Sequence, residues 1–301
     1  MGFQGRGDPR LFLLSGAPHH ANKIRRAVAI SVTYDLVVVD PPQTTQRLAR
    51  MRLENYQLGF SSAHPDAMYN AAARERKAGK TLAILRDHLG PLEHHDLLDI
   101  GCSTGFMTQA YAGQFHSVVG VDIDEPAVQF AISHNPAPNV RFVIADAMQT
   151  GLPATSFDVV TCTHIYEHVP DSGRLIEEIY RVLKPGGVCM FSADNRFKLI
   201  ESHHRLPLLA ALPKPIGHVY YRLAGKGDYY YENHLSYWGL RRLVRKFEII
   251  DYSRRVIADP ERFCASDMIV PGSFKQRLAL LALSAAYWVC PTFIWLLKKP
   301  A

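Results

Sequence analysis

Short apolar runs alternate with helical or turn-rich stretches through the middle of the chain. The apolar runs, which we expect to be strands, are Leu97–Ile100, Ser117–Val121, Val140–Ile144, Phe157–Thr161 and Val188–Ser192. The stretches between them that favour helices are Gly105–Phe115, Glu125–His134 and Gly173–Leu183. Short apolar strands that alternate with helices are typical of a parallel sheet buried on both faces. We therefore predict an α/β fold with a doubly wound, mostly parallel sheet.

The flanking segments follow a different pattern. Helix-forming residues dominate from Thr44 to Leu58 and from Ala67 to Leu89, so we expect two helices before the sheet. The apolar run Leu36–Val39 is either a small edge strand or part of an N-terminal extension, which we place at residues 1–65. We expect residues 66–301 to form one domain, with an aromatic, His-rich insertion at about 195–235 that acts as a substrate lid. A helix over 237–246 and a strand over 247–252 should follow.

The C-terminal segment Leu278–Leu297 holds twenty residues without a charge, flanked by Arg277 and Lys298. At about 1.5 Å per residue, a helix of that length would span the roughly 30 Å of a bilayer core. Pro291, however, divides the segment into an Ala/Leu-rich half and a β-rich half. We favour a helix followed by a final strand over a membrane span, and a membrane-surface role for the helix remains an alternative.

Composition narrows the class of protein. With 48% hydrophobic and 21% charged residues among 301, the chain can bury a substantial core, which excludes a disordered or coiled-coil protein. Its five cysteines form no CxxC pair and no Cys/His metal spacing, so we expect reduced thiols, a cytoplasmic location and no metal site. The N-terminal apolar run, Leu11–Leu14, is too short for the core of a signal peptide.

The net charge of +6 is unevenly distributed. It divides into +4 over residues 1–96, −5 over residues 97–200 and +7 over residues 201–301. A basic protein conventionally suggests nucleic acid as a partner. Here the central segment 97–200 is acidic, so we expect the positive charge of the flanking segments to lie on the substrate-binding side and on the protein surface. An anionic or lipid-linked small molecule, with peripheral membrane contact, fits that distribution at least as well as RNA.

The strongest local motif is the Gly-rich turn after the first strand, with Asp99, Gly101, Ser103 and Gly105 at alternate positions. Such a turn lets the backbone approach a ligand closely. The motif lacks the second and third glycines of a dinucleotide-binding G-x-G-x-x-G loop. It matches the G-x-S-x-G elbow of serine hydrolases, with Ser103 as nucleophile, but that elbow does not explain Asp99 and normally follows several earlier strands.

A third interpretation accounts for more residues. Asp99 through Gly105 resembles the first motif, D-x-G-x-G-x-G, of class I S-adenosylmethionine-dependent methyltransferases, with Ser103 in place of the middle glycine. Four further segments resemble the family's later motifs in the family's order: Val121–Asp124, Val143–Ala147, Phe157–Val169 and Leu183–Gly187. The resemblance implies a Rossmann-like methyltransferase fold and S-adenosylmethionine as cofactor. If the family's glycine has a positive φ, serine at 103 costs roughly 1 kcal/mol.

The resemblance also implies cofactor-binding roles. Asp99, Gly101, Ser103 and Gly105 would form the cofactor loop, Asp122 would accept hydrogen bonds from both ribose hydroxyls, and Ile123 would pack on the cofactor. Asp146 would accept from the exocyclic amine of adenine, beside Ala147. Each acid alone is better explained as a cap of the turn that follows its strand. The joint spacing of Asp122 and Asp146 from Gly101 favours the functional interpretation.

His164 and His168 follow the fourth strand, where a doubly wound sheet presents its substrate-facing edge. Methyl transfer needs a base only where the acceptor must lose a proton, and His164 is the candidate for that role. A structural role for His168 is an equal alternative. We expect transfer to an oxygen of a small molecule such as a sugar, an isoprenoid or a lipid-linked compound. The alternatives are an RNA methyltransferase, a serine hydrolase and a cofactor-binding pseudoenzyme.

Overall fold

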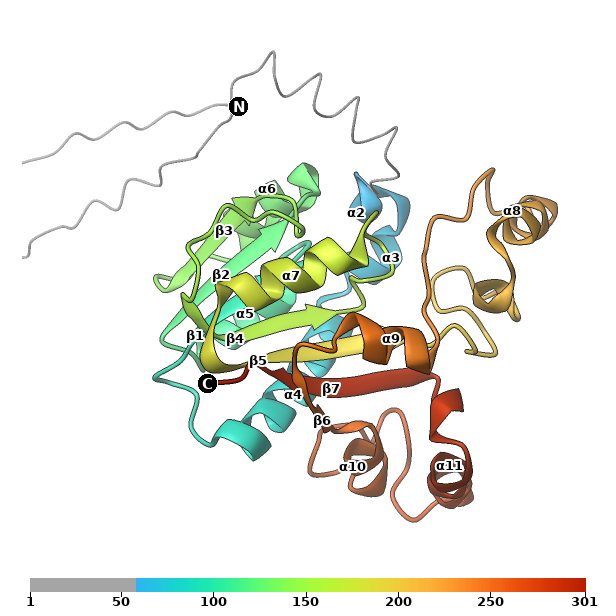
Figure 1. The fold of residues 1–301 in the computed structure, drawn as a ribbon. Coiled ribbons are helices and arrows are strands. Elements are labelled where there is room, and N and C mark those ends of the chain that lie inside the picture. Colours follow the sequence, from blue (N-terminus) through green and yellow to red (C-terminus); the bar gives the residue numbers. More distant parts are fainter. Residues whose placement is uncertain (1–57) are drawn as a thin grey trace, which may run out of the picture.

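A seven-stranded sheet forms the centre of the protein, which a computed structural model describes over residues 58–301 (Figure 1). The strands lie in the order β3-β2-β1-β4-β5-β7-β6, and β7 runs antiparallel to both of its neighbours. Their bounds are β1 (Asp96–Ile100), β2 (Ser117–Asp122), β3 (Val140–Ile144), β4 (Phe157–Thr163), β5 (Leu183–Asp194), β6 (Glu248–Asp251) and β7 (Thr292–Lys298). The strand order reverses between β1 and β4, which confirms the predicted doubly wound sheet.

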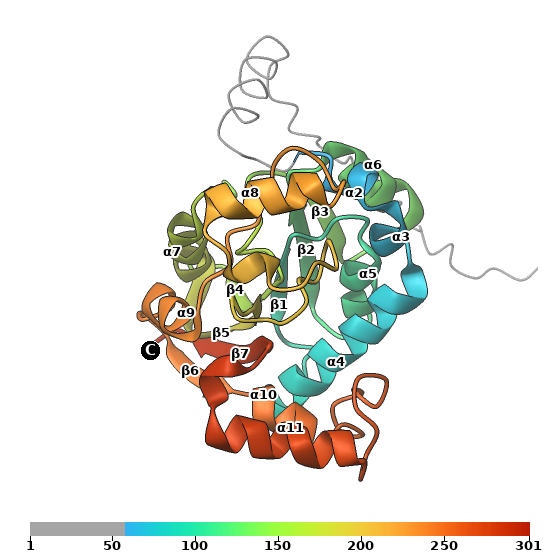
Figure 2. The ribbon, with the colours of Figure 1, turned by 90° about the vertical axis from the view of Figure 1, so that its right-hand side faces the viewer.

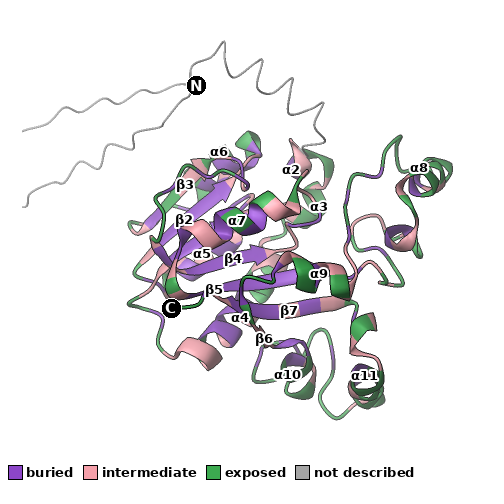
Figure 3. Cartoon of the chain, viewed as in Figure 1, coloured by how far each residue is buried: buried purple, intermediate pink, exposed green. Residues whose placement is uncertain are grey.

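Helices cover both faces of this sheet. On one face, α4 (Ala71–Leu89) and α5 (Phe106–Ala112) pack with α10 (Ser253–Ala258) around buried residues of β1 and β2. On the other face, α7 (Ser172–Val182) and α9 (Tyr237–Leu243) close a second core. The helix α6 (Glu125–His134) contacts β2 and β3. Burial on both faces explains why the strands read as continuous apolar runs (Figure 3).

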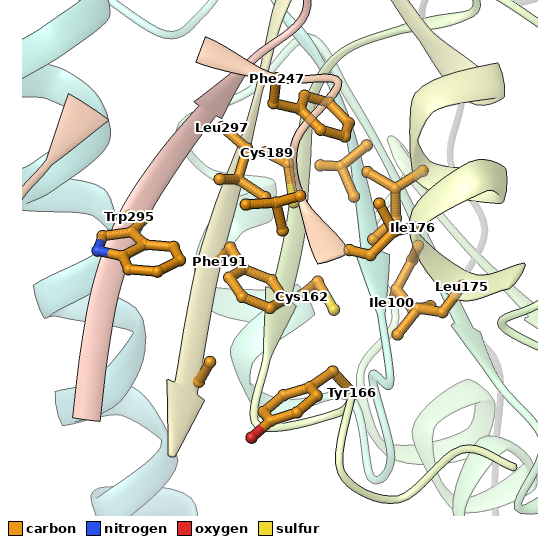
Figure 4. Packing of buried hydrophobic residues seen from close by; sticks show 14 of the residues in the cluster. Ile100, Cys162, Tyr166, Leu175, Ile176, Cys189, Phe191, Phe247, Trp295 and Leu297 are labelled. Atoms are coloured by element: carbon orange, nitrogen blue, oxygen red, sulfur yellow. The ribbon is translucent and has the colours of Figure 1, made fainter. Parts of the chain in front are cut away.

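The second core is built around the strands at the centre of the sheet. Phe191 of β5 lies between Cys162 of β4 and Trp295 of β7, and each of the three is at most 1% exposed (Figure 4). Leu175 and Ile176 bring the apolar side of α7 onto this layer. This packing fixes the C-terminal ends of β4 and β5, and those ends carry residues of the candidate site.

The structure corrects one predicted element and confirms the C-terminal interpretation. The expected helix over 67–89 is divided into α3 (Pro65–Met68) and α4, because the Asn70 side chain accepts a hydrogen bond from the Ala73 amide and begins a new helix. The segment 278–297 forms most of α11 (Phe274–Ala285), the turn η2 (Tyr287–Val289) and most of β7. Among the described residues, no helix is long and apolar enough to cross a membrane. The expected elements at 36–39 and before Leu58 lie outside the described residues.

Between β5 and α9 the chain leaves the sheet. This segment contains the short turn η1 (Leu209–Ala211) and the helix α8 (Lys214–Leu223), which share a small core of Leu209, Tyr221 and Tyr230. It lies in front of the strand ends beside α2 (Phe60–Ala63) and α3 (Figure 2). The Asn233 amide donates a hydrogen bond to the Glu167 carbonyl after β4, at 2.8 Å. The segment is therefore anchored next to the loop that follows β4.

Candidate cofactor and acceptor site

The Gly-rich loop joins β1 to α5 in a conformation that only small residues tolerate. Gly101 and Gly105 have φ of +78° and +77°. A Cβ at Gly101 would lie 2.1 Å from Ile165 Cδ1, and one at Gly105 would lie 2.7 Å from the Ala131 Cβ. The left-handed backbone and the close approach of neighbouring side chains both require glycine here. The loop is thus held against the segment after β4, which contains both predicted histidines.

Ser103 occupies the left-handed region at φ 48°. Its amide donates to Asp122 Oδ2 at 2.8 Å. Among the described residues, no histidine is hydrogen bonded to the Ser103 hydroxyl, so the arrangement of a serine nucleophile with a base is not formed there.

The substitution Ser103→Gly is expected to stabilise the protein. Glycine adopts a positive φ without the strain that a side chain brings, and the Ser103 amide that bonds Asp122 is retained. The gain is partly offset by the greater freedom of glycine in the unfolded chain. We expect the free energy of unfolding to rise by about 0.5–1 kcal/mol, measured by urea denaturation. A decrease would show that the serine hydroxyl contributes to the fold.

Asp99 lies beneath the loop and is 5% exposed. Its two carboxylate oxygens accept hydrogen bonds from Thr161 Oγ1 and Thr108 Oγ1, each at 2.6 Å. Burial raises the pKa of Asp99, and the two threonine hydrogen bonds oppose that rise. Because these bonds tie β1 to β4 and α5, Asp99 is placed to hold the loop in shape.

Asp122 ends β2 with both oxygens directed at backbone amides. Oδ2 accepts from Ser103 and Oδ1 accepts from Asp124 at 2.9 Å. Burial raises the pKa of Asp122 to about 6, although these amides favour the ionised form. Each carboxylate oxygen can accept a second hydrogen bond, so the pair suits two neighbouring hydroxyls. Ile123, the next residue, is half-buried beside it.

Asp146 follows β3 and is 7% exposed. Its Oδ1 accepts from the Met148 amide at 2.8 Å, which is the turn-capping contact that any strand-end acid can make. The Ala145 amide bonds the Asp122 carbonyl at 3.0 Å, so the structure brings the two acids to adjacent strand ends. Ala147 packs against the core next to Asp146.

The two predicted histidines differ in their surroundings. His164 has a positive φ of 57°, and its side chain is 33% exposed. Its Nδ1 lies 3.6 Å from both Glu167 Oε1 and Asp194 Oδ1. His168 packs edge-on against Phe60, with 4.9 Å between ring centroids, and burial lowers its pKa to about 4. His164 is therefore the more open of the two.

The sequence analysis missed a group of buried acids beside these histidines. Glu167, Asp194, Glu201 and Glu232 are each at most 3% exposed. They come from the loop after β4, the end of β5 and the segment that precedes α9. We call them, together with the imidazoles around them, the histidine–carboxylate cluster: Glu167, Asp194, Glu201, Glu232, His164, His168, His203, His204 and His234. The signal in the sequence was the high density of histidine between 195 and 235.

Comparison with known proteins identifies the class. The family described as a methyltransferase domain matches residues 98–191, which run from β1 to β5. A chain in the solved complex between the Haloferax volcanii Trm112 methyltransferase activator and a methyltransferase shares the fold, with a TM-score of 0.50 at 17% identity, over 78% of this chain and 96% of that one. The likeness to that structure shows a Rossmann-like fold, and the family match places a methyltransferase domain at residues 98–191.

Curated relatives agree with that class. The ubiquinone biosynthesis O-methyltransferase of Paracidovorax citrulli is 36% identical over 115 residues, which are 36% of this chain and 48% of the relative. The enzyme of the same name from Pseudomonas putida is 37% identical over 114 residues, which are 36% of this chain and 49% of the relative. The chain spans about half the length of these relatives. Residues 98–191 therefore match a methyltransferase domain and are similar to part of these O-methyltransferases.

Proposed function

We propose that the protein transfers a methyl group from S-adenosylmethionine to an oxygen atom of a small-molecule acceptor. The observation that carries this proposal is the Asp122 carboxylate, held by two amides beside the Gly-rich loop with accepting capacity left on each oxygen. A nucleoside with two neighbouring hydroxyls fits that donor set. The names of the curated relatives, which are O-methyltransferases, support oxygen as the acceptor atom.

The roles of the residues follow from their positions. Asp122 would accept from the ribose hydroxyls, Asp146 would accept from the adenine amine, and the loop from Gly101 to Gly105 would enclose the rest of the cofactor. When bound, the cofactor supplies a methyl carbon on a positively charged sulfur. The net charge of −5 over residues 97–200 would stabilise that positive charge electrostatically.

The acceptor side comprises the loop after β4 and the segment 195–235, which we propose as the acceptor lid. His164 would take the proton of the acceptor hydroxyl as the new O–C bond forms, while the electrons of the broken C–S bond stay on sulfur. Glu167 and Asp194, each with an oxygen 3.6 Å from His164 Nδ1, would stabilise the positive charge that the ring then carries. A sugar, an isoprenoid or a lipid-linked compound remains the proposed acceptor class.

Tritiated S-adenosylmethionine added to fractionated host extract tests the proposal. Label is expected in the lipid or small-molecule glycan fraction with the native chain, and at background level with Asp122→Ala. Label in RNA would instead favour the nucleic-acid alternative. Binding of S-adenosylhomocysteine without any transfer would favour a pseudoenzyme. Absence of that binding would refute the proposal.

Cofactor affinity is expected to fall in mild acid. Hydroxyl donors favour the ionised Asp122 carboxylate, whose pKa is about 6 because of burial. Below that pH each unit should weaken S-adenosylhomocysteine binding by up to about tenfold, because the protonated carboxyl must first lose its proton. Calorimetry between pH 7.5 and 5 measures this effect. A constant affinity over that range would contradict the role of Asp122.

A further inference from the structure

The histidine–carboxylate cluster contains two sets of three potential metal-ligand atoms. The first set is Glu167, His168 and His203, and the second is His164, Glu167 and Asp194. Within each set the ligand atoms lie within 4.8 Å of one another. Glu167 belongs to both sets. Its side chain is fully buried, at the point where the loop after β4 meets the segment 195–235.

The first set contains buried polar atoms that lack hydrogen bonds. Among residues 58–301, neither carboxylate oxygen of Glu167 has a hydrogen-bond partner, and the same holds for His203 Nε2. Glu167 Oε1 and His203 Nε2 are 3.9 Å apart, which is too long for a hydrogen bond. A buried carboxylate without hydrogen bonds is costly unless another charge compensates it. Ligand atoms around a tetrahedral ion with bonds of about 2.1 Å lie about 3.4 Å apart, close to this separation.

We propose that Glu167, His168 and His203 bind a transition-metal ion of the Zn²⁺ type. Two imidazoles and one carboxylate favour Zn²⁺ over Mg²⁺ or Ca²⁺, which prefer oxygen ligands. Three protein ligands leave at least one coordination position open, as in catalytic rather than structural zinc sites. The expectation of no metal rested on cysteine spacing, whereas these ligands come from two segments that only the fold brings together.

The carboxylate of Asp194 in the second set already has a cation and hydrogen-bond donors as partners, which makes this set the weaker candidate for a metal site. Asp194 Oδ2 accepts from Lys198 Nζ at 2.9 Å and also from the Ser202 hydroxyl. Its Oδ1 accepts from Thr292 Oγ1 at 2.6 Å. The Lys198 ammonium neutralises this carboxylate and opposes a cation beside it. His164 is therefore left for the acceptor, next to the proposed ion.

The surroundings hold the proposed ligands in place. The His203 amide donates to Glu201 Oε2 at 3.0 Å, and the Glu167 carbonyl accepts from the Asn233 amide. The Phe60 ring packs edge-on against the rings of His168 and His203, at centroid distances of 4.9 and 6.1 Å. An apolar cover of this kind limits access of water to the ion. These contacts therefore hold the proposed ligands in position.

A role for the ion rests on the proposed function. Ile165, between His164 and Glu167, lies against Gly101, so the proposed metal site adjoins the cofactor loop. An acceptor hydroxyl bound at the open position would have a lowered pKa and would lose its proton more readily, to His164 or to water. The oxygen's electron pair then forms the bond to the methyl carbon. The predicted acceptor thus carries a hydroxyl able to coordinate a metal.

Metal binding by the purified full-length chain tests the inference directly. After treatment with a chelator, the chain is titrated with Zn²⁺ in competition with a chromophoric chelator, and separately with Mg²⁺. We expect one Zn²⁺ per chain, and Co²⁺ in its place should give visible absorption bands. Glu167→Gln and His203→Ala are each expected to weaken Zn²⁺ binding at least about a hundredfold, because second-shell changes alone cost about 10–100-fold. His94→Ala, which removes an exposed histidine outside the cluster, should leave binding unchanged.

Binding of S-adenosylhomocysteine and thermal unfolding are measured on the same samples. A native chain that binds S-adenosylhomocysteine but no Zn²⁺ would overturn the metal site alone, and the cluster would then be a network of contacts between histidines and acids. Equal Zn²⁺ affinity in the native chain and in His203→Ala would overturn it as well. If Glu167→Gln does not fold, His203→Ala decides, because its side chain is 17% exposed and its loss disturbs the core less. Failure of the native chain to bind S-adenosylhomocysteine would refute the proposed function instead.

Discussion

Replacing Asp122 by asparagine is expected to weaken S-adenosylhomocysteine binding at least about a hundredfold. The carboxylate would accept two hydroxyl hydrogen bonds, and each bond to a charged group contributes about 1.5–3 kcal/mol. A loss of about 3 kcal/mol corresponds to about two orders of magnitude in affinity. The amide of asparagine keeps the shape of the side chain but offers only one accepting oxygen. Calorimetric titration at pH 7.5 measures the change.

The same variant should fold about as well as the native chain. Burial raises the pKa of Asp122 in the folded protein to about 6, above its ordinary value of 3.8. Such a group contributes stability that is present below pH 4 and is lost as the pH rises through 6. At pH 7.5 asparagine removes the cost of the buried charge but also loses one amide hydrogen bond, of about 1 kcal/mol. These effects oppose each other, so the melting temperature should change little.

Asp158→Asn provides a matched control. Asp158 is also a half-buried acid of the sheet, but its carboxylate pairs with Lys184 at 2.8 Å and bonds the Asp96 amide, away from the Gly-rich loop. This variant should lose some stability and keep its affinity for S-adenosylhomocysteine. If Asp122→Asn behaved in the same way, Asp122 would be a turn cap and the proposed cofactor site would be wrong.

The order of elements was predictable because strands that are buried on both faces of a sheet form continuous apolar runs in the sequence. Val140–Ile144 and Glu125–His134 have the predicted bounds, since turn residues delimit both segments. The break before Ala71 was missed because one side-chain contact, from Asn70 to the Ala73 amide, decides it within a helix-favouring stretch. Local patterns therefore predict elements better than they predict the ends of elements.

The residues of the candidate site also differ in how far local sequence patterns predict their positions. The neighbouring positions of Asp122 and Asp146 were predictable because each lies at or just after the end of a strand, and parallel strands end at one edge of the sheet. The contact between Glu167 and His203 was not, because the two residues are far apart in sequence and meet only through the path of the segment 195–235. No periodic pattern encodes that path. The left-handed backbone of His164 was not predicted either, because even histidine, which adopts a positive φ more often than most non-glycine residues, does so only in a minority of cases.

Gly101→Ala is expected to have the largest effect on stability. Its methyl group would lie 2.1 Å from Ile165 Cδ1 and 2.7 Å from Cγ1, and alanine is strained at φ +78°. Backbone strain of about 1–2 kcal/mol and overpacking of about 1–3 kcal/mol together predict a loss of about 2–5 kcal/mol in the free energy of unfolding. Because the loop must shift to relieve the clash, S-adenosylhomocysteine affinity should fall as well. Urea denaturation and calorimetry measure the two effects.

Two further variants separate the clash from the backbone strain. Gly186→Ala places alanine at a similar φ of +77° with no atom within 4 Å, so it should lose only about 1–2 kcal/mol and bind S-adenosylhomocysteine normally. Ile165→Ala removes Cδ1 and Cγ1 and leaves the nearest remaining atom, Cβ, at 3.8 Å from the added methyl group. In the double variant with Gly101→Ala, the losses should be less than additive by about 1–3 kcal/mol. Additive losses would show that Ile165 does not hold the cofactor loop against the segment after β4.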